Sequence, residues 1–299
     1  MPLFNPSLAP NLLGDGSDGA LVYDGVATIL GVVPAGNTYT LTRDIYATDL
    51  TVNVGVTLIP NGFRIFVEDT LLNNGVISGN GKNATGITAG ASTVATGSLQ
   101  TAAGGGGNGR STTGAGNGGA GSGGNNICGS GGGNGGNADG GNLGGLGNTS
   151  ASPNANTGGF RHILPFVFGR LPGVTSTVLV AMNGSGGGGG GGTNVGTGTA
   201  SSGAGGSASI PVIIFCNVLN NQGTISSNGG NGSNATATGD GKAGGGGGGA
   251  GGFVGIWYKT LIAQGTVTAN GGLLGTGIGG GANGVNGSAG TTLVEALTA

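Results

Sequence analysis

Hydrophobic residues recur along the chain in three segments of one pattern, at residues 63–82, 211–230 and 253–272. The segments align over twenty residues without a gap. Each opens with β-branched and aromatic residues, passes a turn to a short alternating stretch, and ends at Asn-Gly or a close variant of it. β-Branched and aromatic residues favour strands, and Asn and Gly tolerate the backbone angles of a tight corner. The pattern therefore predicts two strands and a corner in each segment.

Equivalent positions of the three segments carry equivalent residues. The aligned sets are Leu71, Leu219 and Leu261; Gly75, Gly223 and Gly265; Ile77, Ile225 and Val267; Asn80, Asn228 and Asn270; and Gly81, Gly229 and Gly271. A unit this short cannot bury its apolar face alone, so the copies must stack. We predict an all-β fold: a parallel β-solenoid-like body of coils of about 20 residues, with the isoleucines and Val267 in one inward ladder and the asparagines in another at a corner.

Weaker copies and long insertions complete the predicted organisation. Residues 43–62 form a weaker copy, and 176–182 and 291–297 are strand-like fragments. The predicted units are an attachment or capping segment at 1–35, repeat coils at 36–82, a glycine-rich insertion at 83–173 with an aromatic stretch at 160–170, a strand fragment at 174–182, a glycine-rich insertion at 183–209, and further coils with glycine-rich insertions and a terminal strand at 210–299. Insertions of a solenoid project from one face.

Glycine dominates the insertions, with 80 glycines in 299 residues. Two interpretations stay open. The stretches are flexible linkers, or they are packed polyglycine II helices, which have three residues per turn and no internal hydrogen bonds. In the second case every peptide group is free to bond sideways to a neighbour. Collagen is excluded, because the nine prolines are too few.

Charge removes several functional classes. Charged residues make up 6% of the chain and the net charge is −2, so we expect no nucleic-acid binding. The longest apolar run, residues 210–216, is far too short to insert in a membrane. The first residues lack the features of a signal peptide, and we expect none. The G-x-G-x-x-G match at residues 14–19 lacks a preceding strand and a following helix, which predicts a turn and no cofactor.

Few side chains suggest chemistry. Asp15 and Asp18 are weak candidates for a hard cation such as calcium, and otherwise no metal is predicted. His162 is the only histidine and has no nearby cysteine nucleophile. Asp44 and Asp49 would serve as paired carboxylates only if the fold brought them together. We therefore predict no enzyme. Cys216, in an apolar run, is expected to be a small buried residue.

The stretch at residues 160–170 is the most varied sequence between the glycine runs. Its candidate binding residues, for a receptor or another subunit, are Phe160, Arg161, His162, Phe166, Phe168 and Arg170. Aromatic residues and arginine are favoured at recognition surfaces. The alternative is that Phe166, Val167 and Phe168 only pack against the body or a second subunit.

Several motifs resemble a module of glycine-rich structural proteins from tailed bacteriophages. They are residues 14–19 (GDGSDG), 39–46 (YTLTRDIY), 50–58 (LTVNVGVTL) and 60–66 (PNGFRIF), with 253–258 (FVGIWY) and 265–272 (GTVTANGG) after a long glycine run. The glycine-rich insertions are similar to those of phage tail-fibre adhesins, whose polyglycine helices carry variable receptor-binding loops.

The resemblance implies a non-enzymatic protein of the virion surface, of the tail-fibre or adhesin type, that takes part in attachment to the host. The alternatives are a purely architectural capsid decoration or fibre component, and a polysaccharide-cleaving tail spike. We expect no cofactor. The expected partners are further copies, as a trimer or a lattice subunit, other virion proteins, and a host cell-surface glycan or protein.

Overall fold

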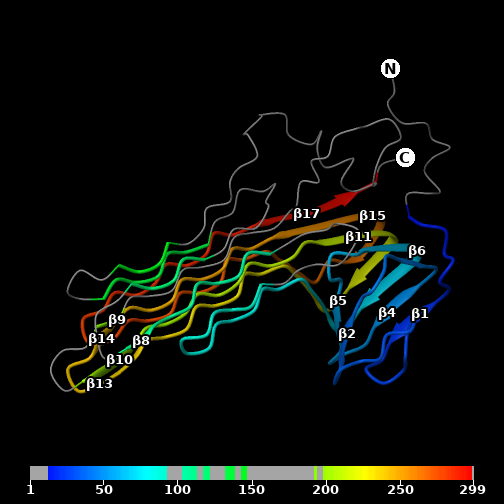
Figure 1. Cartoon of the computed structure of the whole chain (residues 1–299). Coiled ribbons are helices and arrows are strands. Elements are labelled where there is room, and N and C mark those ends of the chain that lie inside the picture. Colours follow the sequence, from blue (N-terminus) through cyan, green and yellow to red (C-terminus); the bar gives the residue numbers. More distant parts are fainter. Residues whose placement is uncertain are drawn as a thin grey trace, which may run out of the picture.

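The computed structural model describes residues 13–92, 103–112, 117–121, 132–138, 143–146, 192–193 and 198–297. Within these ranges the fold is all-β, with two parallel sheets at one end and long irregular segments running away from them (Figure 1). The described part of the chain contains no helical segment of the length and apolarity that crossing a membrane requires. The prediction of an all-β fold is confirmed.

The larger parallel sheet joins strands from both halves of the chain. Its order is β1-β4-β6-β11-β15-β17, and β3 pairs with the first half of β6. The bounds are β1 Leu21–Tyr23, β3 Ile45–Ala47, β4 Leu50–Val52, β6 Arg64–Asn73, β11 Val212–Asn221, β15 Phe253–Ala263 and β17 Thr291–Ala296. Every pairing in this sheet is parallel. Strands separated by more than a hundred residues in sequence therefore lie side by side.

The smaller parallel sheet has the order β16-β12-β7-β5-β2. Its strands are β2 Thr38–Thr40, β5 Thr57–Ile59, β7 Val76–Ser78, β12 Thr224–Ser226 and β16 Thr266–Thr268. Each long strand of the larger sheet is followed, after a corner, by a three-residue strand of this sheet. We call the two sheets together the body.

The core of the body lies between the two sheets and follows the predicted columns. Ile77 pairs with Ile225 and Ile225 with Val267 in register; the two isoleucines are fully buried and Val267 is half-buried. Leu71 and Leu219 are likewise paired and fully buried. Apolar side chains at equivalent positions thus form continuous ladders, which remove from water the surface that one copy alone would expose.

The gapless alignment is correct in the second half of each segment, and in the first half it is wrong by one residue where β11 pairs with β6 up to Cys216 and where Asn220 of β11 pairs with Ala263 of β15. Phe215 pairs with Phe66, whereas Leu219 pairs with Leu71, because the register between β11 and β6 shifts between Cys216 and Val218. A β-bulge of this kind adds one residue to one strand without changing the fold. The strand-like fragment at 291–297 forms β17, which pairs with residues 253–258 of β15.

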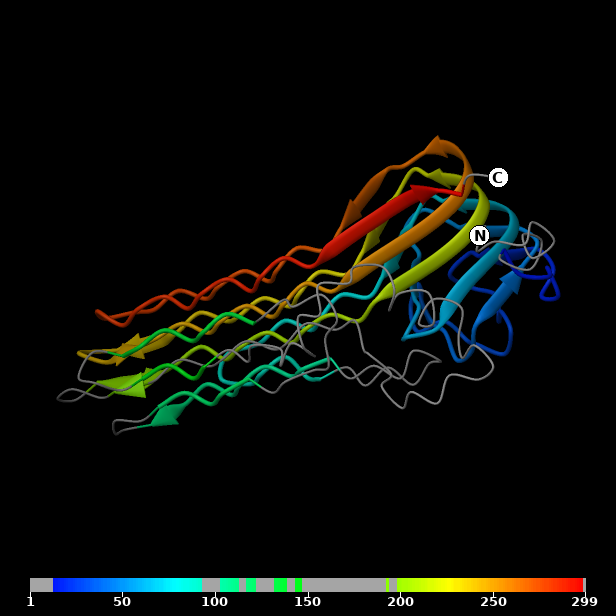
Figure 2. The ribbon, with the colours of Figure 1, turned by 90° about the horizontal axis from the view of Figure 1, so that it is seen from above.

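Six glycine-rich segments leave and re-enter the body and run together as an elongated bundle (Figure 2). Residues 79–90, 227–235 and 269–278 lead away from β7, β12 and β16, and residues 198–211, 243–252 and 281–290 lead back to β11, β15 and β17. We call these six segments the glycine bundle. Its far end carries the short strands β8 Ser111–Thr112, β9 Gly192–Thr193, β10 Thr199–Ser201, β13 Thr236–Thr238 and β14 Lys242–Ala243.

Backbone hydrogen bonds between the segments recur at every third residue. The returning segments are joined by Gly203, Gly206 and Ser209 donating to Gly244, Gly247 and Ala250, and by Gly245, Gly248 and Gly251 donating to Ala282, Val285 and Ser288, at 2.9–3.3 Å. Outgoing and returning segments are joined at the same three-residue interval. The N–H of Gly230 donates to Ser207, that of Ser233 to Ala204, that of Gly249 to Gly230 and that of Gly246 to Ser233. Each segment therefore bonds to several neighbours at once, with its donors shared among them.

Glycine is required in the bundle because the backbones approach closely. A Cβ built at Gly249 would overlap the carbonyl oxygen of Ser207, and one at Gly246 would overlap that of Ala204. Neither glycine has a positive φ, so the requirement at these positions is space and not backbone conformation.

Asparagine side chains bind one outgoing segment to the next. Oδ1 of Asn80 accepts the N–H of Asn228 at 2.7 Å, and Oδ1 of Asn228 accepts that of Asn270 at 2.7 Å. The link recurs at intervals of three residues, from Asn83 to the N–H of Asn231, from Asn231 to that of Leu273, and from Asn234 to that of Thr276. The predicted asparagine ladder is present and continues into the bundle.

Candidate functional site

The far end of the glycine bundle, which we call the tip, presents hydroxyl groups on a small antiparallel sheet. The order is β13-β10-β8, with Thr199 opposite Thr238 and Ser201 opposite Thr236. Threonine alternates with alanine along these strands, so Ala200 is buried while the threonines of β10 and β13 are exposed. Period-two alternation places the two residue types on opposite faces of a strand. Oγ1 of Thr199 lies 2.7 Å from Oγ1 of Thr238.

Exposed charged residues adjoin the strands of this sheet in sequence. A turn after β13 has Gly239 at φ 58° and exposes Asp240, and its N–H donors include that of Gly241, which bonds to the carbonyl of Thr238 at 3.1 Å. The exposed Arg110 adjoins β8, and its N–H donates to Oγ of Ser202 at 2.7 Å. The tip thus combines hydroxyls with the carboxylate of Asp240, the guanidinium of Arg110 and the ammonium of Lys242 on β14.

A shallow groove runs along the side of the bundle. It has a volume of about 320 Å³ and is lined by residues 134–137, Leu143, Gly144, Leu146, Ala282, Asn283 and Val285. Leu143, Leu146 and Val285 are 59%, 69% and 52% exposed, and the lining also includes three asparagines. The walls are held by backbone bonds from Gly133 to Gly248 and from Ala282 to Asn137. The groove offers apolar contacts and amides, without a titratable side chain among its lining residues.

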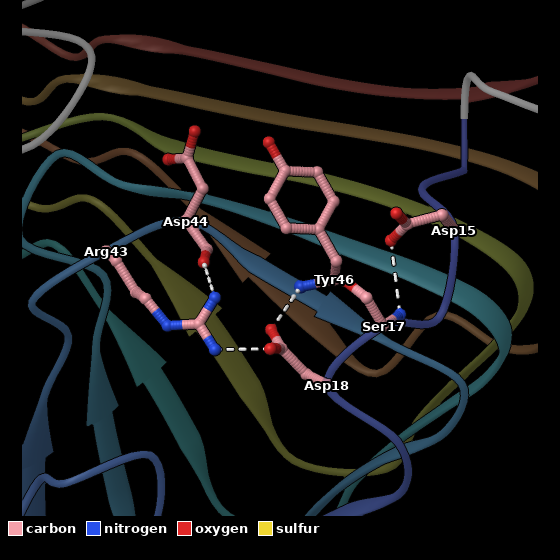
Figure 3. Close-up of polar contacts among 6 residues, drawn as sticks. All are labelled: Asp15, Ser17, Asp18, Arg43, Asp44 and Tyr46. Atoms are coloured by element: carbon pink, nitrogen blue, oxygen red, sulfur yellow. Dashed lines mark hydrogen bonds and ion pairs between the residues drawn. The ribbon is translucent and has the colours of Figure 1, made fainter.

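The two aspartates predicted as weak cation ligands are engaged elsewhere (Figure 3). Asp18 forms an ion pair with Arg43 and accepts the N–H of Tyr46 at 2.8 Å. Asp15 accepts the N–H of Ser17 at 3.1 Å, and hydrogen bonds from Ser17 lower the pKa of its carboxyl. The described residues contain no group of three or more acidic, histidine or cysteine side chains placed to hold a metal ion.

The segment around these aspartates is a turn, as predicted for residues 14–19. Gly14, Gly16 and Gly19 have φ values of 89°, 64° and 68°, and β1 follows directly. Positive φ is the reason for glycine here. The strand that follows excludes the helix that a dinucleotide-binding motif needs at this point.

Asp44 and Asp49, considered as paired carboxylates, each bind a neighbouring strand. Asp44 accepts hydrogen bonds from N, Nε and Nη2 of Arg64 at 2.8, 3.1 and 2.7 Å. Asp49 accepts the N–H of Thr70 at 3.2 Å. The Arg64 guanidinium also lies 5.5 Å from the ring centroid of Phe66. These contacts account for both carboxylates as links between β6 and the preceding chain.

Sequence inspection missed a stack of aromatic rings on the outer face of the larger sheet. Tyr46, Phe66, Phe215 and Trp257 follow one another at centroid distances of 5.1, 5.2 and 4.9 Å, with interplanar angles of 12° or less. The signal was a column of aromatic residues in neighbouring copies, which the one-residue register shift concealed. The rings form a second apolar ladder that packs with Leu13 and Phe253.

Cys216 is fully buried in the core, as predicted, and burial raises the pKa of its thiol to about 12. The six candidate binding residues of the 160–170 stretch, His162 among them, lie outside the described residues, as does the fragment at 176–182. Among the described residues, Asp18, Asp44 and Asp49 are engaged in contacts with neighbouring parts of the body.

Comparison of the chain with models of protein families, with curated proteins and with solved structures finds no match.

Proposed function

We propose that the chain is a non-enzymatic structural protein of a virion surface that projects its tip toward a host cell, as a tail-fibre or adhesin component does. The observation that carries the proposal is the continuous hydrogen-bonded path from the body through the glycine bundle to a hydroxyl-bearing tip. The sequence resemblance to glycine-rich phage proteins supports the same role.

The proposed architecture is a parallel β-solenoid body bearing a polyglycine II bundle. Stacked copies in register support the solenoid. Bonds at every third residue between extended glycine-rich segments are those expected of polyglycine II, whose helix has three residues per turn and no internal hydrogen bonds. Each inter-segment bond contributes about 0.5–1.5 kcal/mol net, so many are needed to offset the entropy of ordering glycine.

A stiff bundle suits attachment because it presents its tip without a further ordering cost. A ligand that binds flexible loops must pay to order them, and pre-organised groups avoid this loss. The exposed hydroxyls of Thr199, Thr236 and Thr238 can donate and accept hydrogen bonds, which suits a polar ligand such as a cell-surface glycan.

The test is binding of the fluorescently labelled full chain to a panel of intact bacteria and to arrayed bacterial glycans. We expect saturable binding to at least one strain, and a loss of at least about fivefold in affinity when the three tip threonines are replaced by alanine, since each lost hydrogen bond costs about 0.5–1.5 kcal/mol. The matched control replaces the exposed Thr291 and Thr292 of the body by alanine.

Two outcomes would count against the role. An absence of binding across the panel, with the bundle intact, would favour a purely architectural component. Release of reducing sugar ends from a bound polysaccharide would establish a cleaving spike instead.

A further inference from the structure

Asparagine followed by glycine recurs in the described parts of the chain, in the body as well as in the glycine bundle. This dipeptide can modify itself, because the backbone nitrogen of the glycine can attack Cγ of the asparagine side chain. Glycine leaves that nitrogen accessible, since it has no Cβ. The attack needs a glycine N–H that is not donated elsewhere and an asparagine side chain that is free to turn toward its own backbone.

In the glycine bundle, hydrogen bonds to a neighbouring segment block both requirements. Oδ1 of Asn80 accepts the N–H of Asn228 at 2.7 Å, while the N–H of Gly81 donates to the carbonyl of Asn228 at 2.8 Å. The side chain is thus held away from the glycine that follows it, and the glycine N–H is engaged. Further pairs with both bonds made are Asn108-Gly109, Asn117-Gly118, Asn228-Gly229, Asn231-Gly232, Asn283-Gly284 and Asn286-Gly287.

The corner between β6 and β7 differs from the bundle. It contains Asn74 and Gly75, and among the described residues neither the Asn74 side chain nor the Gly75 N–H has a hydrogen-bond partner. Gly75 is buried, and a buried N–H without an acceptor is rare. At the equivalent corner of the next copy, the N–H of Gly223 donates to the carbonyl of Asn73 at 2.8 Å.

The bonds that fix this corner use other groups. The N–H of Asn74 donates to the carbonyl of Val52 at 2.9 Å, and the carbonyl of Gly75 accepts the N–H of Thr224 at 3.0 Å. The two groups that would react with each other are therefore left unengaged.

The other copies carry glutamine at this position. Gln222 and Gln264 stand where the first of the three aligned segments has Asn74. A glutamine side chain is longer by one carbon and would have to close a larger ring on the same nitrogen, which is slower. Asn74 is therefore the one reactive asparagine among the three equivalent corners.

We propose that Asn74 is a site of spontaneous deamidation. The Gly75 nitrogen forms a bond to Cγ of Asn74, the bond from Cγ to Nδ2 breaks, and Nδ2 leaves as ammonia with the proton of the Gly75 N–H. Water then opens the resulting succinimide ring at either carbonyl and gives aspartate or isoaspartate. Water is the only co-reactant. The inference does not depend on the role in host attachment.

Isoaspartate would place an additional main-chain carbon in the corner. The Gly75 carbonyl accepts the Thr224 N–H on one side, and the N–H of Val76 donates to the carbonyl of Val56 at 2.9 Å on the other. The insertion would misalign β7 with both neighbouring copies. We expect faster amide exchange at Thr224 in the modified chain.

The test is peptide mapping by mass spectrometry after the full folded chain has been kept at mildly alkaline pH. Trypsin cleaves after Arg64 and Lys82, so one peptide, residues 65–82, contains both Asn74 and Asn80. We expect Asn74 to be converted at least about fivefold faster than Asn80, because two hydrogen bonds must open before Asn80 can react. Asn270 is left out of the comparison, since the outermost copy has no described neighbour there.

Two controls separate the fold from the local sequence. In the chain unfolded by guanidinium, Asn74 and Asn80 should react at similar rates. Asn74→Gln, which gives this corner the residue of the other two copies, should abolish conversion at position 74 and leave both the rate at Asn80 and the circular dichroism unchanged. Equal conversion of Asn74 and Asn80 in the folded chain would overturn the proposal. So would an unmodified Asn74 under conditions in which the unfolded chain reacts.

Discussion

In both the body and the glycine bundle, successive copies stack on one another, but different parts of the residue hold them together. In the body, copies are held by side chains: paired isoleucines and leucines in the core and a column of aromatic rings outside it. In the bundle, copies are held by peptide groups, and the side chain is reduced to a hydrogen atom at close contacts. The comparison shows that successive copies stay in register although apolar side chains hold them together in the body and backbone hydrogen bonds hold them together in the bundle.

The difference has a consequence for tolerance to mutation. Removing atoms harms the body, because a cavity loses its contacts. Adding atoms harms the bundle, because the backbones already touch there. The two regions should therefore respond oppositely to substitutions of similar size, and the following experiments use that contrast.

The largest effect is expected from a truncation in the body. Phe215→Ala removes a fully buried ring stacked between Phe66 and Trp257, and should lower the free energy of unfolding by about 3–5 kcal/mol. Urea denaturation followed by Trp257 fluorescence measures it. Val26→Ala is the control, since Val26 is 83% exposed and its truncation should change stability by less than about 0.5 kcal/mol.

A single added methyl tests the bundle. Gly249→Ala places a Cβ against the carbonyl oxygen of Ser207, and should cost about 1–3 kcal/mol, with faster amide exchange from residues 203–209 and 243–252. Ser288→Ala, at an exposed position of the same bundle, should be neutral. Equal exchange in wild type and variant would mean that close backbone contact does not hold the bundle together.

Alkaline pH should weaken the body through Cys216. Its pKa is about 12 in the folded chain against an ordinary value of 9.0, so the unfolded state releases the proton first as pH rises. Stability from this group is complete below pH 9, and is lost as pH rises toward 12, at about 1.4 kcal/mol per pH unit. Urea midpoints of wild type and Cys216→Ala between pH 8 and about 10.5 measure it. Parallel declines in the two proteins would contradict this origin.

The smallest effect is expected at the asparagine links. Asn231→Ala removes the acceptor of the Leu273 N–H and should cost about 0.5–1.5 kcal/mol. Because the link lies within the bundle, the change should appear as faster amide exchange at Leu273 and leave the exchange of Ile225 in the body unaltered. Exchange that rises equally at both residues would show that bundle and body unfold as one unit.

Much of the body could be predicted from sequence because side chains make it. Identical apolar residues at equivalent positions, such as Leu71 and Leu219, indicate which residues pair between neighbouring strands. The bulge between Cys216 and Val218 could not be foreseen, since inserting one residue into a strand leaves its composition unchanged. The aromatic stack was hidden by that same shift.

The bundle was harder to read, because glycine carries no side chain to reveal its neighbours. Asparagine at intervals of three, as at Asn228, Asn231 and Asn234, marks the face turned to the next copy, and Gly249 differs from any linker glycine only in what lies beside it. The tip depends on which distant segments meet there, such as β10 and β13, which local sequence does not specify.

The asparagine links also determine by which steps the length of the glycine bundle, from the body to the tip, can change. Asn80 bonds to a residue 148 positions later and Asn228 to one 42 positions later, yet both detours return to the same alignment. If each detour gained three residues on its way out and three on its way back, the projection would lengthen by one turn, about 9 Å, and every contact nearer the base would be preserved. Reach would then be quantised: whole triplets move the tip outward in fixed steps, whereas one or two extra residues would rotate every subsequent donor away from its acceptor.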